Sequence, residues 1–402
     1  MEAIRTGSAD RLQPAIVGVA FLSPTKNPAA SAPDRLAGIA ANPVSNPRQQ
    51  RLLQACLAGV EDGAALADTL PPHRVGPLLH WQINQYDLAA PLELRTGLAA
   101  QALGARRQWA RVSEVAQTLS MALAGAGIES VLLKGSALAR SIYPEPWLRP
   151  MDDVDILVPE RAMADVQRIF AGLGLQLRPP QTRAERLNHH WPLAAMQAHG
   201  GIVFVEVHQR VLNTRLGRPL ALDALQRPLQ RLDTGDGAVW SLRPEELLAT
   251  QLLRFRHLTE ILRAISVADV VGLAEVHRET IDWDRLRRRV PRLAEIFAAL
   301  QAVTPLSDAL CHTLGLNPEA ASGQIALARR GYHGWPVNTH LKRRRGRPPA
   351  RALLRDTLCP DRWWSQLAYA NAPHGAGRLR TLGLDHPRNL LAQTLRRFYY
   401  GG

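Results

Sequence analysis

The apolar residues of this chain change their spacing roughly a third of the way along the sequence, and this change most constrains the fold. Before it, they recur every three or four residues, most clearly from Leu92 to Ala124, as expected for helices. Short apolar runs rich in β-branched residues follow at Ile128–Leu133 and Val154–Val158, and these predict strands. Two more strands are predicted at Leu193–Gln197 and Ile202–His208. We interpret these segments as a small mixed sheet.

Helical spacing returns after the strands, so we predict an α+β fold in which a small mixed-sheet core is flanked by N- and C-terminal helical lobes. The N-terminal stretch is rich in Pro, Ala and Ser and lacks apolar periodicity, which is typical of disorder. The predicted organisation is a disordered leader at 1–46, an N-terminal helical lobe at 47–125, an α/β core at 126–243, a helical bundle at 244–330 and a basic C-terminal extension at 331–402.

Three local features add detail to this organisation. Pro159 is expected to open a helix over Glu160–Leu173, because proline suits a first helical turn. Leu175–Leu177 is interpreted as a further short strand. Asp282 is a candidate N-cap for a helix beginning near Trp283.

The composition indicates a soluble protein of a reducing compartment. The three cysteines, Cys56, Cys311 and Cys359, are far apart and show no metal-binding spacing, so we expect free thiols. No apolar run is long enough to cross a bilayer. We therefore predict a cytoplasmic protein without a membrane partner.

Two acids stand at the start of a predicted strand. Asp153 and Asp155 are two residues apart, so their carboxylates lie on the same face of the strand and repel each other. A divalent cation would compensate, and Mg²⁺ is the usual one beside phosphates. The alternative is a pair of solvated or capping acids, because Asp-x-Asp is a short pattern.

Glu206 lies inside an apolar run, Val203–Val207, that is expected to be buried. A buried carboxylate is costly unless it is paired or binds a metal. His208 shares its strand face, and a third carboxylate would complete a two-metal phosphoryl-transfer site. The alternative is a structural ion pair between Glu206 and one of the many arginines.

Lys134, Gly135 and Ser136 join the first predicted strand to a short helix. Glycine permits a close backbone approach, and a helix N-terminus offers free N–H groups to a phosphate. Lys134 is one of only three lysines in a chain whose positive charge is nearly all arginine. The alternative is an ordinary strand-to-helix turn, in which Gly-Ser is common.

The order of these motifs resembles the polymerase-β type of nucleotidyltransferase fold. More closely, the segments Leu132–Ala139, Arg149–Val158 and Val205–His208 resemble a family of uncharacterised bacterial nucleotidyltransferases. The resemblance covers roughly residues 50–310. One departure is Asp152, where a small residue is more typical of the family.

The resemblance implies a role for each matching residue. Asp153, Asp155 and Glu206 would be the catalytic carboxylates and the ligands of Mg²⁺, in a two-metal site. The residues implied to bind the nucleotide are Lys134, Gly135, Ser136 and Arg149. The residues suggested to contact the acceptor or to support the carboxylates are His208, His189 and His190, although paired loop histidines are more often simply exposed.

The sequence thus predicts a Mg²⁺-dependent enzyme that transfers a nucleoside monophosphate from a nucleoside triphosphate, expected to be ATP, to an acceptor. The acceptor is left open among a peptide, a small molecule, a sugar, a protein and RNA. Family members are often encoded beside biosynthetic operons, which implies a biosynthetic role.

Other features leave two alternative functions open. The chain has a net charge of +14, and its basic run Lys342–Arg347 would suit a nucleic-acid-binding protein or a nucleotidyltransferase acting on RNA ends. We favour a compositional origin for this charge, because arginine replaces lysine along the whole chain. The second alternative is a non-catalytic nucleotide-binding scaffold, against which the three intact acids count. His257 and Asp269 could close over the nucleotide, but a polar contact between helices is the favoured interpretation.

Overall fold

The computed structural model of the protein describes most of the chain between residues 32 and 325. The described residues are 32–180, 191, 194–211, 221–222, 225, 229–233, 238–255, 263–290, 292–325, 387–388 and 391. None of the described helices is both long enough and apolar enough to cross a membrane.

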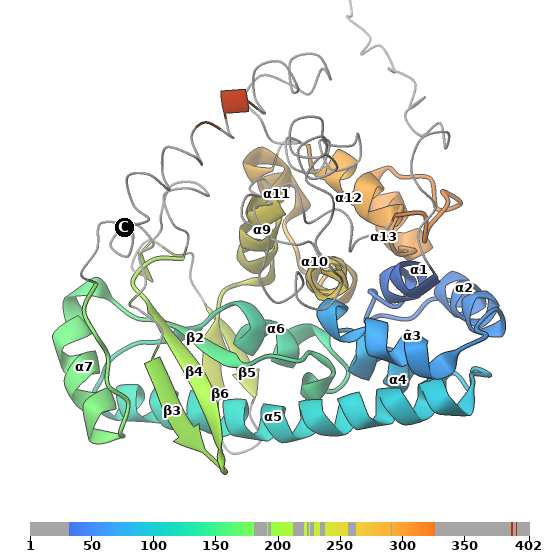
Figure 1. The fold of residues 1–402 in the computed structure, drawn as a ribbon. Coiled ribbons are helices and arrows are strands. Elements are labelled where there is room, and N and C mark those ends of the chain that lie inside the picture. Colours follow the sequence, from blue (N-terminus) through green and yellow to red (C-terminus); the bar gives the residue numbers. More distant parts are fainter. Residues whose placement is uncertain are drawn as a thin grey trace, which may run out of the picture.

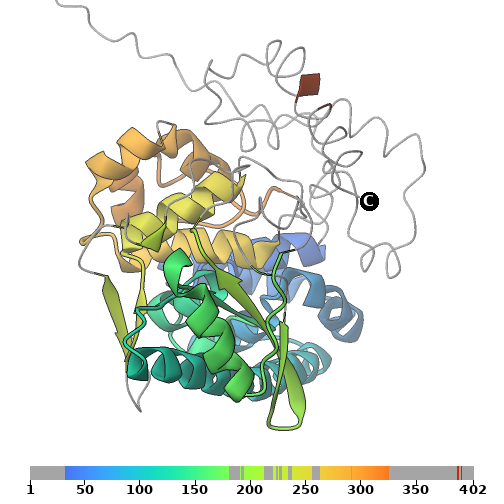
Figure 2. The same cartoon turned by 90° about the vertical axis from the view of Figure 1, so that its left-hand side faces the viewer.

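The described structure contains a six-stranded mixed sheet with the strand order β3-β4-β2-β1-β6-β5, above α5 (Leu92–Gly125) and below α9 (Pro244–Phe255) in Figure 1. The strands are β1 (Val131–Leu132), β2 (Asp153–Leu157), β3 (Ala194–Ala198), β4 (Gly201–His208), β5 (Gln230–Asp233) and β6 (Ala238–Ser241). β2 runs parallel to β4 and β1 parallel to β6, whereas the other neighbours are antiparallel. The β3–β4 hairpin and the β5–β6 hairpin therefore form opposite edges of the sheet (Figure 2).

Helices precede the sheet in the chain. They are α1 (Ala32–Ile39), α2 (Pro47–Ala58), α3 (Gly63–Thr69), α4 (Gly76–Gln85) and α5 (Leu92–Gly125), with a 3₁₀ turn at Pro71–His73. The 34-residue α5 runs beneath both the sheet and the N-terminal helices, as Figure 1 shows. It contacts β2, β3 and β4 as well as α3 and α4, so this one helix packs against both the sheet and the N-terminal helices.

The alternation of residues along the strands decides which face is buried. On β4, Val203, Val205 and Val207 are fully buried, whereas Ile202 and Phe204 on the other face are exposed. α7 (Met163–Gly172), which follows a 3₁₀ turn at Glu160–Ala162, packs against α5. The opposite face of β2 and β4 carries the acidic residues.

A second group of helices follows the sheet: α9 (Pro244–Phe255), α10 (Ala264–Val276), α11 (Trp283–Arg289), α12 (Leu293–Gln301) and α13 (Asp308–Leu314). α10 is buried along most of its length, and Gly272 allows its backbone to approach Pro43 and Ile142 closely. The side chain of Asp282 accepts a hydrogen bond from the backbone N–H of Arg285. The predicted N-cap of α11 is therefore confirmed.

The predicted fold class is confirmed, because a mixed sheet lies between preceding and following helices. Two local predictions are corrected, and one pair of strands was missed. Residues 32–46 are not disordered, because they include α1 and the buried residues Leu36 and Ile39. Leu175–Leu177 forms no strand. The strands β5 and β6 were not predicted.

The proposed domain boundaries remain predictions. Buried apolar residues from Leu36 to Ile325 form one continuous cluster, to which both helical groups and the sheet contribute. Nearly all of the basic extension, including the run at 342–347, lies outside the described residues.

Candidate functional site

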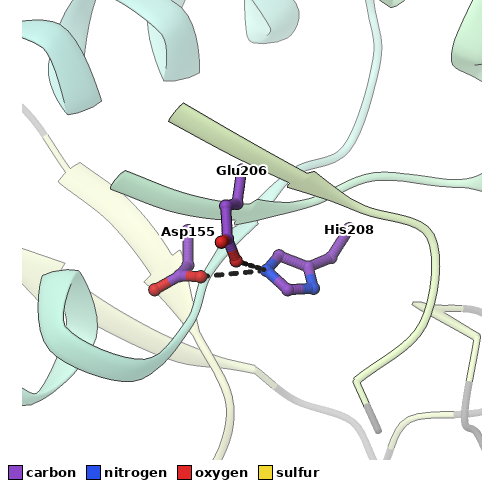
Figure 3. Close-up of side chains that lie close together, drawn as sticks. All are labelled: Asp155, Glu206 and His208. Atoms are coloured by element: carbon purple, nitrogen blue, oxygen red, sulfur yellow. Dashed lines mark hydrogen bonds and ion pairs between the residues drawn. The ribbon is translucent and has the colours of Figure 1, made fainter. Parts of the chain in front are cut away.

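The acidic residues of β2 and β4 meet because these two strands are adjacent and parallel. In the register of the sheet, Asp155 lies beside Glu206, and Asp153 lies beside Phe204. The side chains of Asp155, Glu206 and His208 converge on the same face, with the His208 ring turned toward both carboxylates (Figure 3). Two short apolar strands are thus sufficient to bring the predicted acids together.

Lys134 and His208 bind the carboxylates directly. Lys134 Nζ lies 2.5 Å from Asp155 Oδ1 and 3.1 Å from Glu206 Oε2. His208 Nε2 lies 2.9 Å from Asp155 Oδ1 and 3.4 Å from Glu206 Oε2. Because Asp155 is only 2% exposed, these partners compensate a charge that would otherwise be costly to bury.

The backbone places Lys134 at this position through a sharp turn between β1 and α6 (Lys134–Ile142). Leu133 still donates its backbone N–H to the carbonyl of Asp155 at 2.9 Å, so the chain follows the sheet up to that residue. Lys134 then adopts a left-handed backbone with φ of 43°, which is uncommon for a residue other than glycine. Such strain at a functional position persists only when the surroundings hold it in place.

The remainder of this turn is buried beneath the site. Ser136 is fully buried in the first turn of α6, and its hydroxyl donates to the backbone carbonyl of Asp153 at 3.4 Å. A side chain at Gly135 would collide with the guanidinium of Arg149. Glycine is therefore required for Arg149 to lie against the N-terminus of α6.

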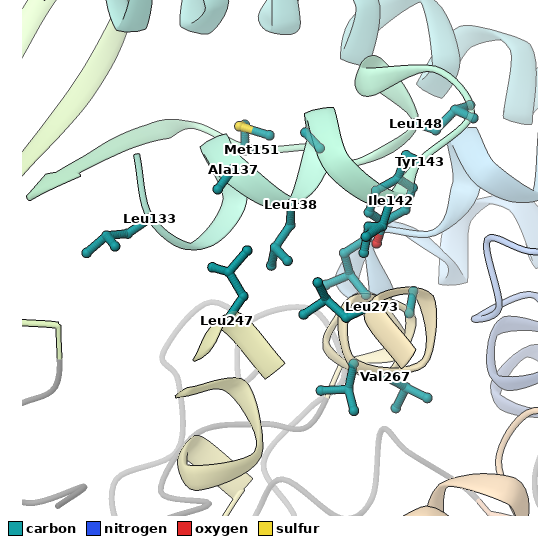
Figure 4. Packing of buried hydrophobic residues seen from close by; sticks show 14 of the residues in the cluster. Leu133, Ala137, Leu138, Ile142, Tyr143, Leu148, Met151, Leu247, Val267 and Leu273 are labelled. Atoms are coloured by element: carbon teal, nitrogen blue, oxygen red, sulfur yellow. The ribbon is translucent and has the colours of Figure 1, made fainter. Parts of the chain in front are cut away.

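Arg149 is fixed by a residue from the C-terminal helices. Its Nε and Nη2 donate to the two carboxylate oxygens of Asp269 on α10, at 2.8 and 2.7 Å. Tyr143 donates its hydroxyl to Asp269 Oδ1 at 2.9 Å. Apolar contacts between α6 and α10 surround this network, with Leu138, Ile142 and Leu273 among them (Figure 4).

The pKa values of Asp153 and Asp155 are shifted in opposite directions. Burial opposes the charge of Asp155, but the ammonium of Lys134 and the hydrogen bond from His208 hold the pKa of Asp155 well below its ordinary value. Burial and the charge of Asp155 raise the pKa of Asp153, and Lys134 offsets this only in part. The pKa of Glu206 is lowered, because the hydrogen bond from His208 and the charge of Lys134 outweigh burial.

The same donors fit a divalent cation. One atom from each of Asp155, Glu206 and His208 lies within 4.8 Å of the other two. The carboxylates supply the hard oxygen ligands that Mg²⁺ prefers, and the ammonium of Lys134 already lies against both of them. Asp153 projects from the same face of β2 and offers a further oxygen, although it is not a member of this three-residue group.

The structure brings most of the predicted site residues into one place. Asp153, Asp155, Glu206 and His208 share one face of the sheet, and Lys134 contacts two of the carboxylates. Gly135, Ser136 and Arg149 lie directly beside them. His189, His190 and His257 lie outside the described residues.

Two ion-pair partners were not predicted. Asp269 was expected to make a polar contact between helices, and its partner is Arg149. Asp152, whose presence was unusual for the family, is exposed and forms an ion pair with Arg74 at 2.5 Å. Its charge is therefore directed away from the other acids and toward the N-terminal lobe.

A mixed sheet with adjacent carboxylates beside a Gly-Ser turn is the arrangement of a nucleotidyltransferase. The chain belongs to the family described as "Uncharacterised nucleotidyltransferase", whose model matches residues 61–310, more than half of the sequence. The protein is accordingly an enzyme of the transferase class, and the earlier resemblance is confirmed.

Two solved structures overlap with this chain at low similarity. The antibiotic-resistance factor ANT(2'')-Ia is 10% identical with a TM-score of 0.34, over 47% of this chain and 94% of its own. An antigenic nucleotidyltransferase-like protein from Paracoccidioides brasiliensis is 16% identical with a TM-score of 0.29, over 50% of this chain and 94% of its own. No curated protein matches the sequence.

Proposed function

We propose that the protein transfers a nucleoside monophosphate from a nucleoside triphosphate, ATP being the expected donor, to an acceptor nucleophile in a Mg²⁺-dependent reaction. The observation that carries this proposal is the pairing of Asp155 with Glu206 across β2 and β4, beside the Lys134–Ser136 turn. Family membership supports nucleotidyl transfer as the class of reaction.

The triphosphate is proposed to bind at the N-terminus of α6. The free backbone N–H groups and the dipole of a helix N-terminus favour a phosphate, and Gly135 leaves room there for the guanidinium of Arg149. Arg149 has Nε and Nη2 occupied by Asp269, which leaves Nη1 directed toward Gly135. Lys134 and Arg149 would thus supply positive charge on two sides of the phosphates.

The metal is proposed to bind to Asp153, Asp155 and Glu206, in a site for two Mg²⁺ ions. Bound there, Mg²⁺ would neutralise the negative charge of the phosphates and of the carboxylates that surround them. The lowered pKa values of Asp155 and Glu206 support this assignment, because only ionised carboxylates are effective ligands. His208 would hold both of these carboxylates in place through its Nε2.

The reaction exchanges one bond at the α-phosphorus for another. The acceptor oxygen or nitrogen attacks the α-phosphorus, and the bond to the oxygen bridging to the β-phosphorus breaks, releasing pyrophosphate. The acceptor proton is proposed to pass to Glu206, whose side chain is 21% exposed and therefore remains accessible from solvent. Holding both reactants in line accounts for a large part of such a rate enhancement.

We propose that the acceptor is a peptide, a small molecule, a sugar, a protein or RNA. We also propose that the protein acts in the cytoplasm. The basic run at 342–347, on which the nucleic-acid alternative depends, lies outside the described residues.

Nucleotide transfer is the direct test. The full chain would be incubated with each α-³²P-labelled NTP, Mg²⁺ and host-cell lysate, beside the Asp153→Asn and Asp155→Asn variants. Asp152→Asn is a matched control, because Asp152 is the adjacent acid but is exposed and pairs with Arg74. We expect labelled product with the wild type and the control only.

The negative result is equally informative. Absence of transfer with every NTP, together with absence of Mg²⁺-dependent NTP binding in calorimetry, would remove the catalytic proposal. Transfer by Asp155→Asn at the wild-type rate would show that the carboxylates are structural.

A further inference from the structure

Two large apolar side chains are exposed on the face of β4 that carries the site. Ile202 is 50% exposed and Phe204 is 39% exposed, and both alternate with the fully buried valines of the same strand. Residues at every second position share a face, so Ile202, Phe204, Glu206 and His208 form one row. We refer to Ile202 and Phe204 as the apolar strip.

The apolar strip is continuous with the site. Phe204 lies directly beside Asp153 in the sheet register and two residues from Glu206. On its other side, the strip faces Ala195 and Gln197 of β3, which are also exposed. A small residue opposite Phe204 leaves the aromatic ring accessible from above the sheet.

The topology separates this strip from the region proposed to bind the phosphates. The Lys134–Ser136 turn follows β1, which is next to β2 on one side, whereas β4 is next to β2 on the other side. A nucleotide bound at the N-terminus of α6 thus reaches Asp153 and Asp155 from the β1 side. The β4 side, where Glu206 projects, is left for the second substrate.

We propose that the apolar strip binds the acceptor, and that the acceptor carries an aromatic or alkyl group beside its nucleophile. This inference rests on the proposed function and names the substrate class of the same site. Successive same-face residues are about 7 Å apart along a strand. A nucleophile at Glu206 therefore places the apolar group about 7 Å away on Phe204, with room for a further ~7 Å of it over Ile202.

The physical reason is the transfer of apolar surface from water. An acceptor that reaches Glu206 along β4 must cover Phe204, and covering this exposed ring removes the most apolar surface from water when the group placed over it is itself apolar. A strongly hydrated acceptor, such as a sugar, would lose water over Phe204, where the opposite residue Ala195 offers no side-chain hydrogen bond. The row thus selects for an acceptor that is polar at one end and apolar at the other.

Two alcohols with the same nucleophile provide a defined test. The probe is 4-phenyl-1-butanol, and the comparison is 1,4-butanediol, which carries a second primary hydroxyl in place of the ring and whose kcat/KM is therefore divided by two. The formation of each alkyl nucleotide from α-³²P-ATP would be measured for the wild type, Phe204→Ser, Ile202→Ser and Met121→Ser. Met121 is a matched control, because it is 62% exposed but lies on α5 away from the strip.

We expect the wild type and Met121→Ser to prefer the phenyl alcohol by about tenfold in kcat/KM, which is the range for covering one ring face. Phe204→Ser should bring this ratio close to one, with a smaller decrease for Ile202→Ser. An unchanged ratio in Phe204→Ser, or no preference in the wild type, would overturn the inference. If only an acceptor from lysate is labelled, its KM must increase by about tenfold in Phe204→Ser, and an unchanged KM overturns the inference in the same way.

The test distinguishes this inference from the proposed function and from other occupants of the strip. No labelled product with any acceptor, and no Mg²⁺-dependent ATP binding, would instead remove the proposed function on which the inference depends. Size-exclusion chromatography with light scattering would be run on the wild type and Phe204→Ser. A dimeric wild type that becomes monomeric in the variant would assign the strip to a second copy of the chain and overturn the inference.

Discussion

Arg149 and Asp269 form a two-point contact in which Nε and Nη2 of the guanidinium each donate to one carboxylate oxygen, at 2.8 and 2.7 Å. The side chains are 13% and 5% exposed, so the pair is largely shielded from water. Burial disfavours the charge of Arg149, but Asp269 more than compensates and raises the pKa of the guanidinium above its ordinary value. The contact joins α10 to the N-terminus of α6.

Asp269→Asn should therefore impair transfer although Asp269 is not proposed to contact the substrate. The amide can no longer accept two charged hydrogen bonds, so Arg149 loses its fixed orientation beside Gly135. We expect kcat/KM to fall by about tenfold to a hundredfold, which is the usual cost of misplacing a positioning group. Steady-state kinetics with varied ATP would show whether KM or kcat carries the loss.

Tyr143→Phe is the matched control for this effect. It removes one hydrogen bond to Asp269 but preserves the two-point contact with Arg149. Its loss of kcat/KM should be small. If the loss of activity in both variants followed the decrease in their melting temperatures, the role of Asp269 would be only structural.

Asn substitutions at Asp153 and Asp155 should change stability in opposite directions. Asp155 forms buried contacts with Lys134 and His208, so Asp155→Asn is expected to lower the free energy of unfolding. We expect a decrease of about 2 kcal/mol, which is less than for a fully buried pair because Lys134 is one-third exposed to solvent. Burial and the charge of Asp155 raise the pKa of Asp153, which means that the ionised carboxylate is unfavourable in the folded state. Asp153→Asn removes this charge and should stabilise the fold. Urea unfolding at pH 7 without metal would measure both changes, and a decrease in both variants contradicts the assignment.

The destabilisation by Asp155→Asn should depend on pH. The folded-state pKa of Asp155 is depressed, so its ionised form contributes stability that is fully present above the unfolded pKa. This contribution is lost as the pH falls through the folded pKa, beginning below about pH 5. The difference between wild type and variant should therefore be largest near neutrality and decrease on acidification, which urea unfolding at a series of pH values would measure. A constant difference from pH 7 to pH 3 would rule out this linkage.

Local sequence patterns were sufficient to predict much of the site. Asp153, Asp155 and Glu206 lie on short apolar strands whose period fixes the side-chain direction, so their shared face follows once the strands are adjacent. Lys134 shows the limit of such reasoning. Its position on the Gly-Ser turn was predictable, but its contact with Asp155 depends on how β1 pairs with β2.

The parts that could not be predicted depend on long-range packing. Asp269 lies 120 positions from Arg149, and no local pattern joins them. β5 has the sequence Gln-Arg-Leu-Asp, which lacks apolar alternation and becomes a strand only by pairing with β6. α1 lies in a Pro-, Ala- and Ser-rich stretch whose few apolar residues become buried only against other helices.

Replacing Lys134 should increase the dependence of the fold on a divalent cation. In Lys134→Met, Asp155 and Glu206 lose the ammonium that lies between them, so their repulsion is compensated only by His208 and by any bound metal. We expect a lower melting temperature without metal and a larger increase on adding Mg²⁺ than in the wild type. Differential scanning calorimetry with EDTA or with Mg²⁺ would measure both. An equal increase in melting temperature on adding Mg²⁺ to the two proteins would indicate that the cation binds elsewhere. Lys342→Met is the control for the loss of a lysine.

α1 should contribute to stability as a structural element rather than as part of a leader. Leu36 is 1% exposed, Asp34 contacts His73 at 3.2 Å, and the carbonyl of Ile39 accepts a hydrogen bond from Thr304 at 3.0 Å. α1 thus bridges the N-terminal lobe and the helices that follow the sheet.

Leu36→Ala should lower the free energy of unfolding by about 2 to 5 kcal/mol, because it leaves a cavity in the core. Arg35→Ala, on the exposed side of the same helix, should change it by less than about 0.5 kcal/mol. Urea unfolding of the full chain measures both, and equal effects of the two substitutions would show that α1 is not packed as described.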